Sequence, residues 1–329
     1  MLQSLSIVGI VKRGESRNVA KIIVTGGAGF VGSNLVDALV ERGDEIIVID
    51  NFSTGKRENL DKSRDKILTI ELSLDLNNAW ENFDNLKGAD AIVHLAALPR
   101  VGRSIDNPVE THIANVNGTL SVLELARLLK IKRFIYASSS SVYGDVDPEN
   151  FPIKETYLDL NPENPYATQK LIGEQYCKVY QKVYGLNTVM LRFFNVYGSR
   201  MATEGAYKLI FAWWIEQIKA GKRLSIYGDG TQTRDFTHVT DIVTGIIASI
   251  DKPLDSVITM PINLCTGIET SVNELAELFN WGTEKVTNPR GKDEKRKVGS
   301  NERAKSILNW EPQVTLTNGI EKLRSEHGI

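Results

Sequence analysis

Short apolar segments alternate with amphipathic segments over the first half of the chain. Six runs rich in Val, Ile and Leu read as strands, and several are separated by stretches with the helical period of 3.6 residues. Continuous apolar strands that alternate with helices are typical of a parallel sheet covered on both faces. We therefore predict an α/β fold with a doubly wound parallel sheet. The expected strands are Lys21–Thr25, Glu45–Asp50, Ile67–Leu72, Ala91–Leu95, Arg133–Ala137 and Thr188–Leu191, and the clearest helices are Ser33–Arg42, Asn115–Lys130 and Tyr166–Tyr184.

The pattern changes after Asn195, where connections become longer and more polar. We expect a smaller mixed α/β lobe there, completing a cleft beside the sheet. The predicted units are a leader over residues 1–19, a sheet domain over 20–192 and, over 193–329, mostly the second lobe. Its expected elements are the strands Leu224–Tyr227 and Ile262–Leu264 and the helices Ser271–Phe279 and Glu302–Leu308.

Composition and charge exclude several classes of protein. The chain has 329 residues, 42% hydrophobic and 24% charged, which is a globular rather than a disordered composition. With 39 Lys and Arg against 41 Asp and Glu, it lacks the basic excess expected for binding nucleic acid or an anionic membrane. No run approaches the roughly 20 apolar residues of a membrane helix. Two cysteines and four scattered histidines predict neither a disulfide framework nor a metal site, and we expect a cytoplasmic protein.

A glycine-rich loop follows the first expected strand. Gly26, Gly29 and Gly32 stand in Thr25–Gly32, directly before a helix. Such glycines allow a tight turn and let backbone N–H groups approach a pyrophosphate at the helix start. Asp50 ends the second strand, where a carboxylate can bind ribose hydroxyls and would repel a 2′-phosphate. The spacing therefore favours NAD over NADP.

A tyrosine and a lysine follow Asn164-Pro165 at an expected helix start. Tyr166 and Lys170 are four residues apart and share one helix face. A nearby cation favours the phenolate of a tyrosine, whose ordinary pKa of about 10 makes it a poor base at neutral pH. Four serines, Ser138 to Ser141, end the fifth expected strand, at the sheet edge where ligands bind in open α/β folds. This combination indicates proton transfer on a substrate alcohol.

Together these motifs resemble the extended short-chain dehydrogenase/reductase superfamily, and the resemblance implies a Rossmann-type sheet. Further stretches narrow it to the nucleotide-sugar epimerases, most closely the UDP-glucose/UDP-N-acetylglucosamine 4-epimerases. The similarity runs from Ala20 to Leu323. It rests on Asp50–Asn59, His94–Ala97, Asn115–Thr119, Leu191–Gly198 and Tyr227–Phe236.

The resemblance implies a site for each ligand. Tyr166, Lys170 and Ser139 match the catalytic residues, with Tyr166 removing the proton of the sugar C4 hydroxyl while C4 passes hydride to a tightly bound NAD. The implied cofactor residues are Gly26, Gly29, Phe30, Val31, Gly32, Asp50, Asn51, Ser53, Thr54, Gly55, Asp75, Leu76, Leu95, Ala96, Ala97, Asn115, Tyr166 and Lys170. The implied UDP-sugar residues are Ser139, Ser140, Asn195, Leu209, Tyr227, Arg234, Arg290 and Asp293.

Two features bear on competing reactions. Ser140 and Ser141 occupy the positions where related 4,6-dehydratases carry an acid–base pair, which argues against dehydration. A UDP-glucuronate decarboxylase or 4-epimerase and a nucleotide-sugar dehydrogenase stay open. Lys297 falls where relatives carry a residue beside the hexose; a lysine there could reach a uronate carboxylate, but its place in the charge run Lys292–Lys297 favours a solvated side chain.

The resemblance also implies a homodimer, formed through a four-helix interface. Its helices are Asn115–Lys130 and Tyr166–Tyr184. We expect Leu120, Leu123, Leu128, Tyr176 and Tyr180 to supply apolar surface there, although the same residues could pack on the sheet.

Overall fold

A computed structural model describes residues 19–76, 80, 83–202, 208–253, 258–288 and 294–329. All but one residue of the expected leader, 1–19, lies outside these ranges.

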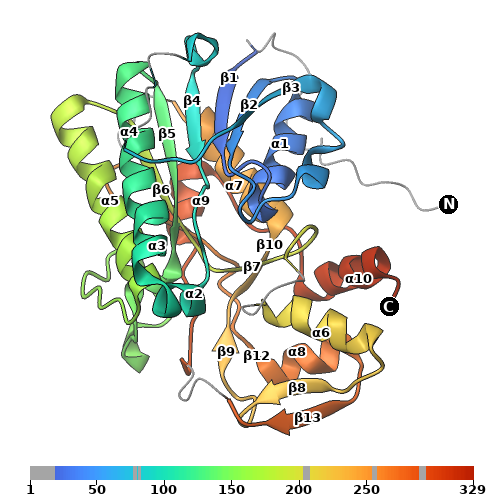
Figure 1. Ribbon diagram of the computed structural model, residues 1–329. Coiled ribbons are helices and arrows are strands. Elements are labelled where there is room, and N and C mark those ends of the chain that lie inside the picture. Colours follow the sequence, from blue (N-terminus) through green and yellow to red (C-terminus); the bar gives the residue numbers. More distant parts are fainter. Residues whose placement is uncertain (1–18, 77–79, 81–82, 203–207, 254–257, 289–293) are drawn as a thin grey trace.

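The core of the molecule is a seven-stranded parallel sheet with the order β11-β6-β5-β4-β1-β2-β3 (Figure 1). All six strands predicted for the first half of the chain are present, four of them with ends shifted by one or two residues. The Rossmann-type prediction is therefore confirmed. The strands are β1 (Lys21–Thr25), β2 (Glu45–Asp50), β3 (Ile67–Glu71), β4 (Ala91–His94), β5 (Arg133–Ser139), β6 (Thr188–Phe193) and β11 (Ile262–Leu264).

The strand order reverses between β1 and β4. From β1 the chain adds β2 and β3 on one side, and then returns to place β4, β5 and β6 on the other. Side chains at the carboxyl ends of β1 and β4 therefore border a crevice, which is where open α/β sheets bind their ligands. Thr25 and His94 end these two strands and are register partners.

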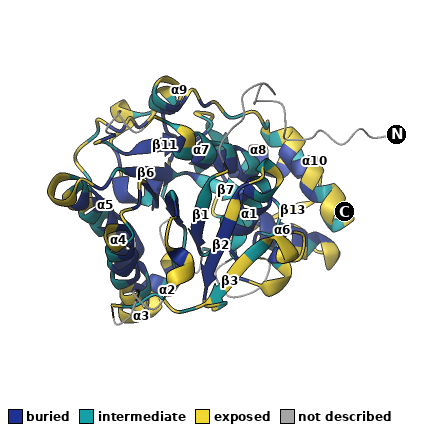
Figure 2. Cartoon of the chain, turned by 90° about the horizontal axis from the view of Figure 1, so that it is seen from above, coloured by how far each residue is buried: buried dark blue, intermediate teal, exposed yellow. Residues whose placement is uncertain are grey.

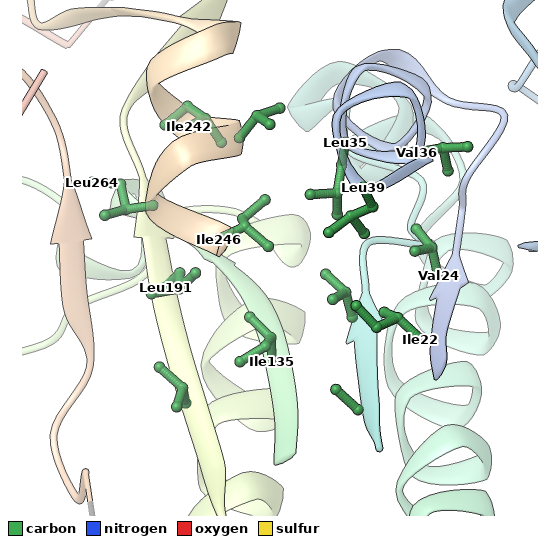
Figure 3. Close-up of a cluster of buried hydrophobic side chains, with 14 of the residues drawn as sticks. Ile22, Val24, Leu35, Val36, Leu39, Ile135, Leu191, Ile242, Ile246 and Leu264 are labelled. Atoms are coloured by element: carbon green, nitrogen blue, oxygen red, sulfur yellow. The ribbon is translucent and has the colours of Figure 1, made fainter. Parts of the chain in front are cut away.

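Helices cover both faces of the sheet, as Figure 2 shows from above. On one face, α1 (Phe30–Arg42) and α7 (Val239–Asp251) lie side by side and bury a shared aliphatic layer (Figure 3). On the other face lie α4 (Gly118–Leu128) and α5 (Pro165–Tyr184). Burial of this much apolar surface at roughly 25 cal/mol per Å² is the main stabilising contribution.

Several elements that follow residue 192 in the sequence belong to the sheet domain and not to the second lobe. β11, α7 and α9 (Glu302–Leu308) all come from residues that we expected to belong mostly to the second lobe, yet β11 pairs with β6 and α9 packs against β11. A strand of three residues is too short for its pattern to show whether it belongs to the central sheet or to the second lobe, and the pairing of β11 with β6 decides the difference.

The second lobe packs helices on small two-stranded sheets. Its core centres on Trp214 and Phe279, whose rings meet edge to face. The sequence analysis identified β8 and α8 but not α6 or α10. The elements are α6 (Ile210–Lys219), α8 (Val272–Phe279), α10 (Leu316–His327), the pairs β8 (Leu224–Tyr227) with β13 (Thr283–Val286) and β9 (Thr233–Arg234) with β12 (Thr270–Ser271), and β7 (Asn195–Tyr197) with β10 (Phe236–His238) nearer the sheet.

Two short helices, α2 (Val101–Asp106) and α3 (Pro108–His112), connect β4 to α4 through a π-helical turn over Ile113–Asn117. α2 and α3 both contact α5. Within the described ranges, none of the helices combines the length and the apolar character needed to cross a membrane.

Of the two possibilities given for the five apolar residues of α4 and α5, packing on the sheet holds for four of them. Leu123 is 0% exposed and Tyr180 is also buried, so both pack on the sheet of their own chain. Leu120 and Tyr176 are partly buried against the same core. Of the five predicted residues, only Leu128 is exposed as expected. The helix period alone did not show which side of each helix the sheet would cover.

Candidate active site

The glycine loop is a cradle too tight for side chains. Gly26 has a φ of 70°, and a Cβ there would lie 2.6 Å from the backbone nitrogen of Ala96. A Cβ on Gly32 would lie 2.1 Å from the carbonyl oxygen of Gly26. Helix α1 starts directly after this loop, with Gly29 as an N-cap that supplies no side-chain acceptor. The first N–H groups of α1, which have no acceptor within the helix, are thus available to a pyrophosphate.

We expect Gly32→Ala to weaken NAD binding by about 10- to 100-fold. Overpacking costs about 1–3 kcal/mol, and each 1.4 kcal/mol is a factor of ten in affinity. Titration of apoprotein with NAD measures the effect. Gly282→Ala is the matched control, because its Cβ would meet only ordinary contacts at 3.6 Å or more. Equal affinities for the two variants would contradict the role given to the cradle.

Asp50 stands at the end of β2 beside the glycine loop. Its carboxylate accepts the N–H of Ala28 at 2.9 Å and the N–H of Phe52 at 2.8 Å. Burial raises the pKa of Asp50, while these two backbone bonds lower it. A carboxylate has about four lone-pair positions, so two remain for ribose hydroxyls. The residues present therefore fit a dinucleotide without a 2′-phosphate.

The predicted adenosine residues gather at the carboxyl ends of β2 and β3. The Asn51 amide donates to the Ser73 hydroxyl at 3.1 Å and accepts the N–H of Ser53 at 3.0 Å. The bond between Asn51 and Ser73 joins the loop after β2 to the segment after β3. Gly55 is buried against Ala28, and Ser53, Thr54, Asp75 and Leu76 are partly or fully exposed around the same edge.

The side-chain amide of Asn115 is buried and holds the segment that follows β4. Asn115 accepts the N–H of Leu98 at 2.7 Å and donates to Gln169 at 2.7 Å. It thus holds the chain just past the Leu95–Ala97 turn. His94, which the sequence analysis gave no separate role, sits between the Thr25 and Thr119 hydroxyls at 2.7 and 3.0 Å. Burial lowers the pKa of His94 to about 3, so the ring is a neutral link between β1, β4 and α4.

Tyr166 lies in the first turn of α5, as predicted. The Asn164 side chain caps this helix by accepting the N–H of Ala167 at 3.0 Å, and Pro165 occupies the first position. The backbone N–H of Tyr166 donates to the Ser104 hydroxyl of α2 at 3.1 Å. Tyr166 and Ser139 are both buried, and the Ser139 hydroxyl donates to the Ser141 hydroxyl at 3.0 Å.

The protonation of the Tyr166 and Lys170 pair is set by burial. Desolvation raises the pKa of Tyr166 to about 12, while Ser139 and the guanidinium of Arg100 oppose that rise. Desolvation lowers the pKa of Lys170 to about 8. Its ammonium donates to the carbonyl oxygen of Ala137 at 2.7 Å and lies 6.0 Å from the centre of the Tyr166 ring.

A fully buried ion pair connects the helix that carries Tyr166 and Lys170 to the central sheet. Glu174, four residues after Lys170 on α5, binds the guanidinium of Arg192 on β6 at 2.7 and 2.8 Å. It also accepts the Ser138 hydroxyl at 2.6 Å, next to Ser139 on β5. These bonds fix α5 against β5 and β6, and with them the positions of Tyr166 and Ser139. The sequence analysis did not identify this pair, because neither residue is unusual in its local pattern.

A cavity of about 350 Å³ opens between β7 and the second lobe. Four predicted substrate residues line it together: Asn195, Leu209, Tyr227 and Arg234. Trp213, which the sequence analysis did not identify, also lines it, with its ring centre 5.0 Å from that of Tyr227. The Arg234 guanidinium donates to the carbonyl oxygen of Glu294 at 2.9 Å. A charged fork, an amide and aromatic walls suit a nucleoside diphosphate.

The prediction that the Lys297 side chain is solvated is wrong. Its side chain does not extend into solvent: the residue is 3% exposed and donates to the carbonyl oxygen of Gly144 at 2.8 Å. It also forms an ion pair with Glu294. Lys297 is therefore a buried cation that already has a carboxylate partner. Of the predicted residues, Arg290 and Asp293 lie outside the described ranges, and Ser140 is buried directly after Ser139 in a 3₁₀ turn.

The fold and the site fit a dinucleotide-dependent enzyme. Comparison with protein families gives a match over residues 22–265 to the NAD dependent epimerase/dehydratase family. The chain belongs to this family, and its members use NAD.

Individual relatives are similar over nearly the whole chain. A UDP-glucose 4-epimerase from Mycolicibacterium smegmatis is 34% identical, over 92% of this chain and 96% of its own. UDP-glucuronic acid decarboxylase 1 from Arabidopsis thaliana is 36% identical, over 97% of this chain and 72% of its own. A mutant UDP-glucuronic acid 4-epimerase from Bacillus cereus, solved with a fluorinated UDP-glucuronic acid and NAD, matches with a TM-score of 0.84 at 30% identity, over 94% of this chain and 99% of its own.

Proposed function

We propose that this enzyme inverts the configuration at C4 of a UDP-hexose through a 4-keto intermediate, using tightly bound NAD. The observation that carries the proposal is the meeting of Tyr166, Lys170 and Ser139 at the same sheet edge as the glycine cradle. The cavity lined by Asn195 and Arg234 supports a UDP-linked sugar. A cytoplasmic location stays a prediction from sequence.

In this proposal, one group of residues transfers the proton and another holds the UDP part of the substrate. Tyr166 accepts the proton of the C4 hydroxyl, with Ser139 as the hydrogen-bonding bridge between phenol and substrate. Lys170 adds positive charge that favours the phenolate. The glycine loop and Asp50 would hold NAD, which would supply the hydride acceptor and donor for C4. Asn195 and Arg234 hold the diphosphate while the 4-keto sugar turns, so the intermediate stays in the site.

Two alternative reactions, dehydration and decarboxylation, are known on related scaffolds. A 4,6-dehydratase needs an acid and a base where this chain has Ser140 and Ser141, and hydroxyl groups with no carboxylate beside them in this turn do not supply such a pair. Decarboxylation of UDP-glucuronate uses the same first oxidation at C4. It is the second candidate, supported by the 36% identity to a UDP-glucuronic acid decarboxylase.

Proton NMR of the sugar tests the proposal. Purified protein without added NAD is incubated separately with UDP-glucose, UDP-N-acetylglucosamine and UDP-glucuronate. We expect at least one sugar to convert to its C4 epimer with no net redox change. Formation of a UDP-pentose with release of CO₂ would indicate a decarboxylase. Accumulation of reduced cofactor would indicate a dehydrogenase. No conversion of any sugar, even after NAD is supplied, would contradict the proposal.

We further propose a homodimer through α4 and α5, which lie side by side at one side of the molecule (Figure 1). The exposed apolar residues there are Leu128 on α4 and Val179, Val183 and Tyr184 on α5. Val179 and Val183 are four residues apart and share one helix face. A second copy related by a twofold axis would bring two such helix pairs together and cover this apolar surface.

Val183→Asp is expected to raise the dimer dissociation constant at least about tenfold, because it places a charge in the covered surface. Light scattering after size exclusion at micromolar protein measures the shift from dimer to monomer. Leu158→Asp is the control, since Leu158 is exposed elsewhere. A wild-type monomer at these concentrations would contradict the dimer.

A further inference from the structure

Arg100 is a cation beside the reacting centre that the predicted mechanism does not use. It is the N-cap residue of α2, three residues after the Leu95–Ala97 turn. The Ser104 hydroxyl of the same helix accepts the backbone N–H of Tyr166 at 3.1 Å, which holds α2 against the start of α5. The carbonyl oxygen of Arg100 accepts the N–H of Ser104 at 3.0 Å, so Arg100 belongs to the same helical turn that binds Tyr166. Its guanidinium is partly buried, and its positive charge opposes the rise in the pKa of the Tyr166 phenol.

Two other cations that bear on this comparison have carboxylate partners. Arg103, one turn further along α2, binds Glu110 at 2.6 Å. Lys297 has Glu294. Arg100, by contrast, makes no ion pair with a carboxylate among the described residues. A partly desolvated guanidinium without an anion is unfavourable until an anion binds.

We propose that Arg100 binds a carboxylate on the sugar, so that the substrate class is a UDP-hexuronate. This inference rests on the proposed function, which places the C4 hydroxyl at Tyr166. C6 is two bonds from C4, so a C6 carboxylate bound there lies within reach of a side chain next to the Tyr166 phenol. The planar fork of arginine matches both carboxylate oxygens. The sequence analysis considered Lys297 for this task but favoured a solvated side chain; because Lys297 is buried against Glu294, we assign the task to Arg100 instead.

The test measures binding rather than turnover. Calorimetry with the NAD-loaded Tyr166→Phe variant compares UDP-glucuronate with UDP-glucose, and the same comparison is made after adding Arg100→Gln. We expect UDP-glucuronate to bind at least tenfold more tightly than UDP-glucose before that change. Arg100→Gln should weaken UDP-glucuronate by about 10- to 100-fold, the loss of a charge-assisted pair, and alter UDP-glucose by less than threefold. Arg103→Gln, the matched control on the same helix, should leave both affinities unchanged.

Two results would overturn the inference. One is equal affinity for the two sugars when Arg100 is intact. The other is an equal loss for both sugars in Arg100→Gln, which would mean that Arg100 serves only the Tyr166 phenol. If Arg100→Gln does not fold, Arg100→Lys keeps the charge without the fork, and the same selective loss for UDP-glucuronate is required of it. Absence of C4 inversion in the wild type would refute the proposed function separately, since the binding comparison needs no turnover.

Discussion

Tyr166→Phe is expected to lower kcat by about 10²- to 10⁴-fold, the usual contribution of a positioned acid–base group. In the proposed mechanism the phenol accepts the proton of the C4 hydroxyl, and phenylalanine keeps the ring while removing the oxygen. Burial raises the pKa of Tyr166 to about 12 even with Ser139 and Arg100 opposing the rise. The phenol is therefore protonated at neutral pH until further positive charge, such as that of an oxidised nicotinamide, favours the phenolate. The rate of C4 inversion, followed by NMR, measures the loss.

The cofactor should stay bound in this variant. The cradle at Gly26 and Gly32 and the carboxylate of Asp50 are formed by β1, β2 and α1, none of which the substitution touches. Absorbance of the protein-bound dinucleotide checks this. Tyr176→Phe is the control, because Tyr176 lies on the same helix but packs against the sheet core. Turnover near the wild-type rate in Tyr166→Phe would remove Tyr166 from the mechanism.

Glu174→Ala is expected to lower the free energy of unfolding by about 3–5 kcal/mol, the range for breaking a buried ion pair. The alanine leaves the guanidinium of Arg192 buried without its carboxylate, and the Ser138 hydroxyl loses its acceptor. Urea unfolding measures the change. The double change of Glu174 and Arg192 to methionine should be far less destabilising, because no uncompensated charge then remains in the core.

A surface pair gives the comparison for this experiment. Glu110→Ala breaks the exposed contact with Arg103 and should leave the unfolding free energy almost unchanged, because solvent screens such pairs. Equal effects of Glu174→Ala and Glu110→Ala would show that the buried pair does not stabilise the fold. A destabilised Glu174→Ala variant with normal kcat would show that the pair supports the fold without positioning Tyr166.

Local pattern was sufficient for several parts of the fold and site. Gly26 and Gly29 lie between β1 and α1, and Gly32 lies in the first turn of α1; the order of strand, glycines and helix alone predicted the cradle. Tyr166 and Lys170 were found because their spacing places them on one helix face after the Asn164-Pro165 cap. The central strands were predicted because strands buried on both faces are apolar throughout.

The sequence by itself thus determined the parallel sheet, the tight glycine loop and the placement of Tyr166 and Lys170 at the start of α5, because each depends on residues close together in the chain. Only the tertiary structure decided which charges are neutralised. Lys297 meets Glu294 and the carbonyl of Gly144 because the second lobe folds back on the end of β5, whereas Arg100 reaches Tyr166 because α2 docks on α5. It also placed β11 in the sheet and turned Leu123 inward. Ion pairing and burial depend on distances between segments far apart in sequence, and these distances exist only once the chain has packed.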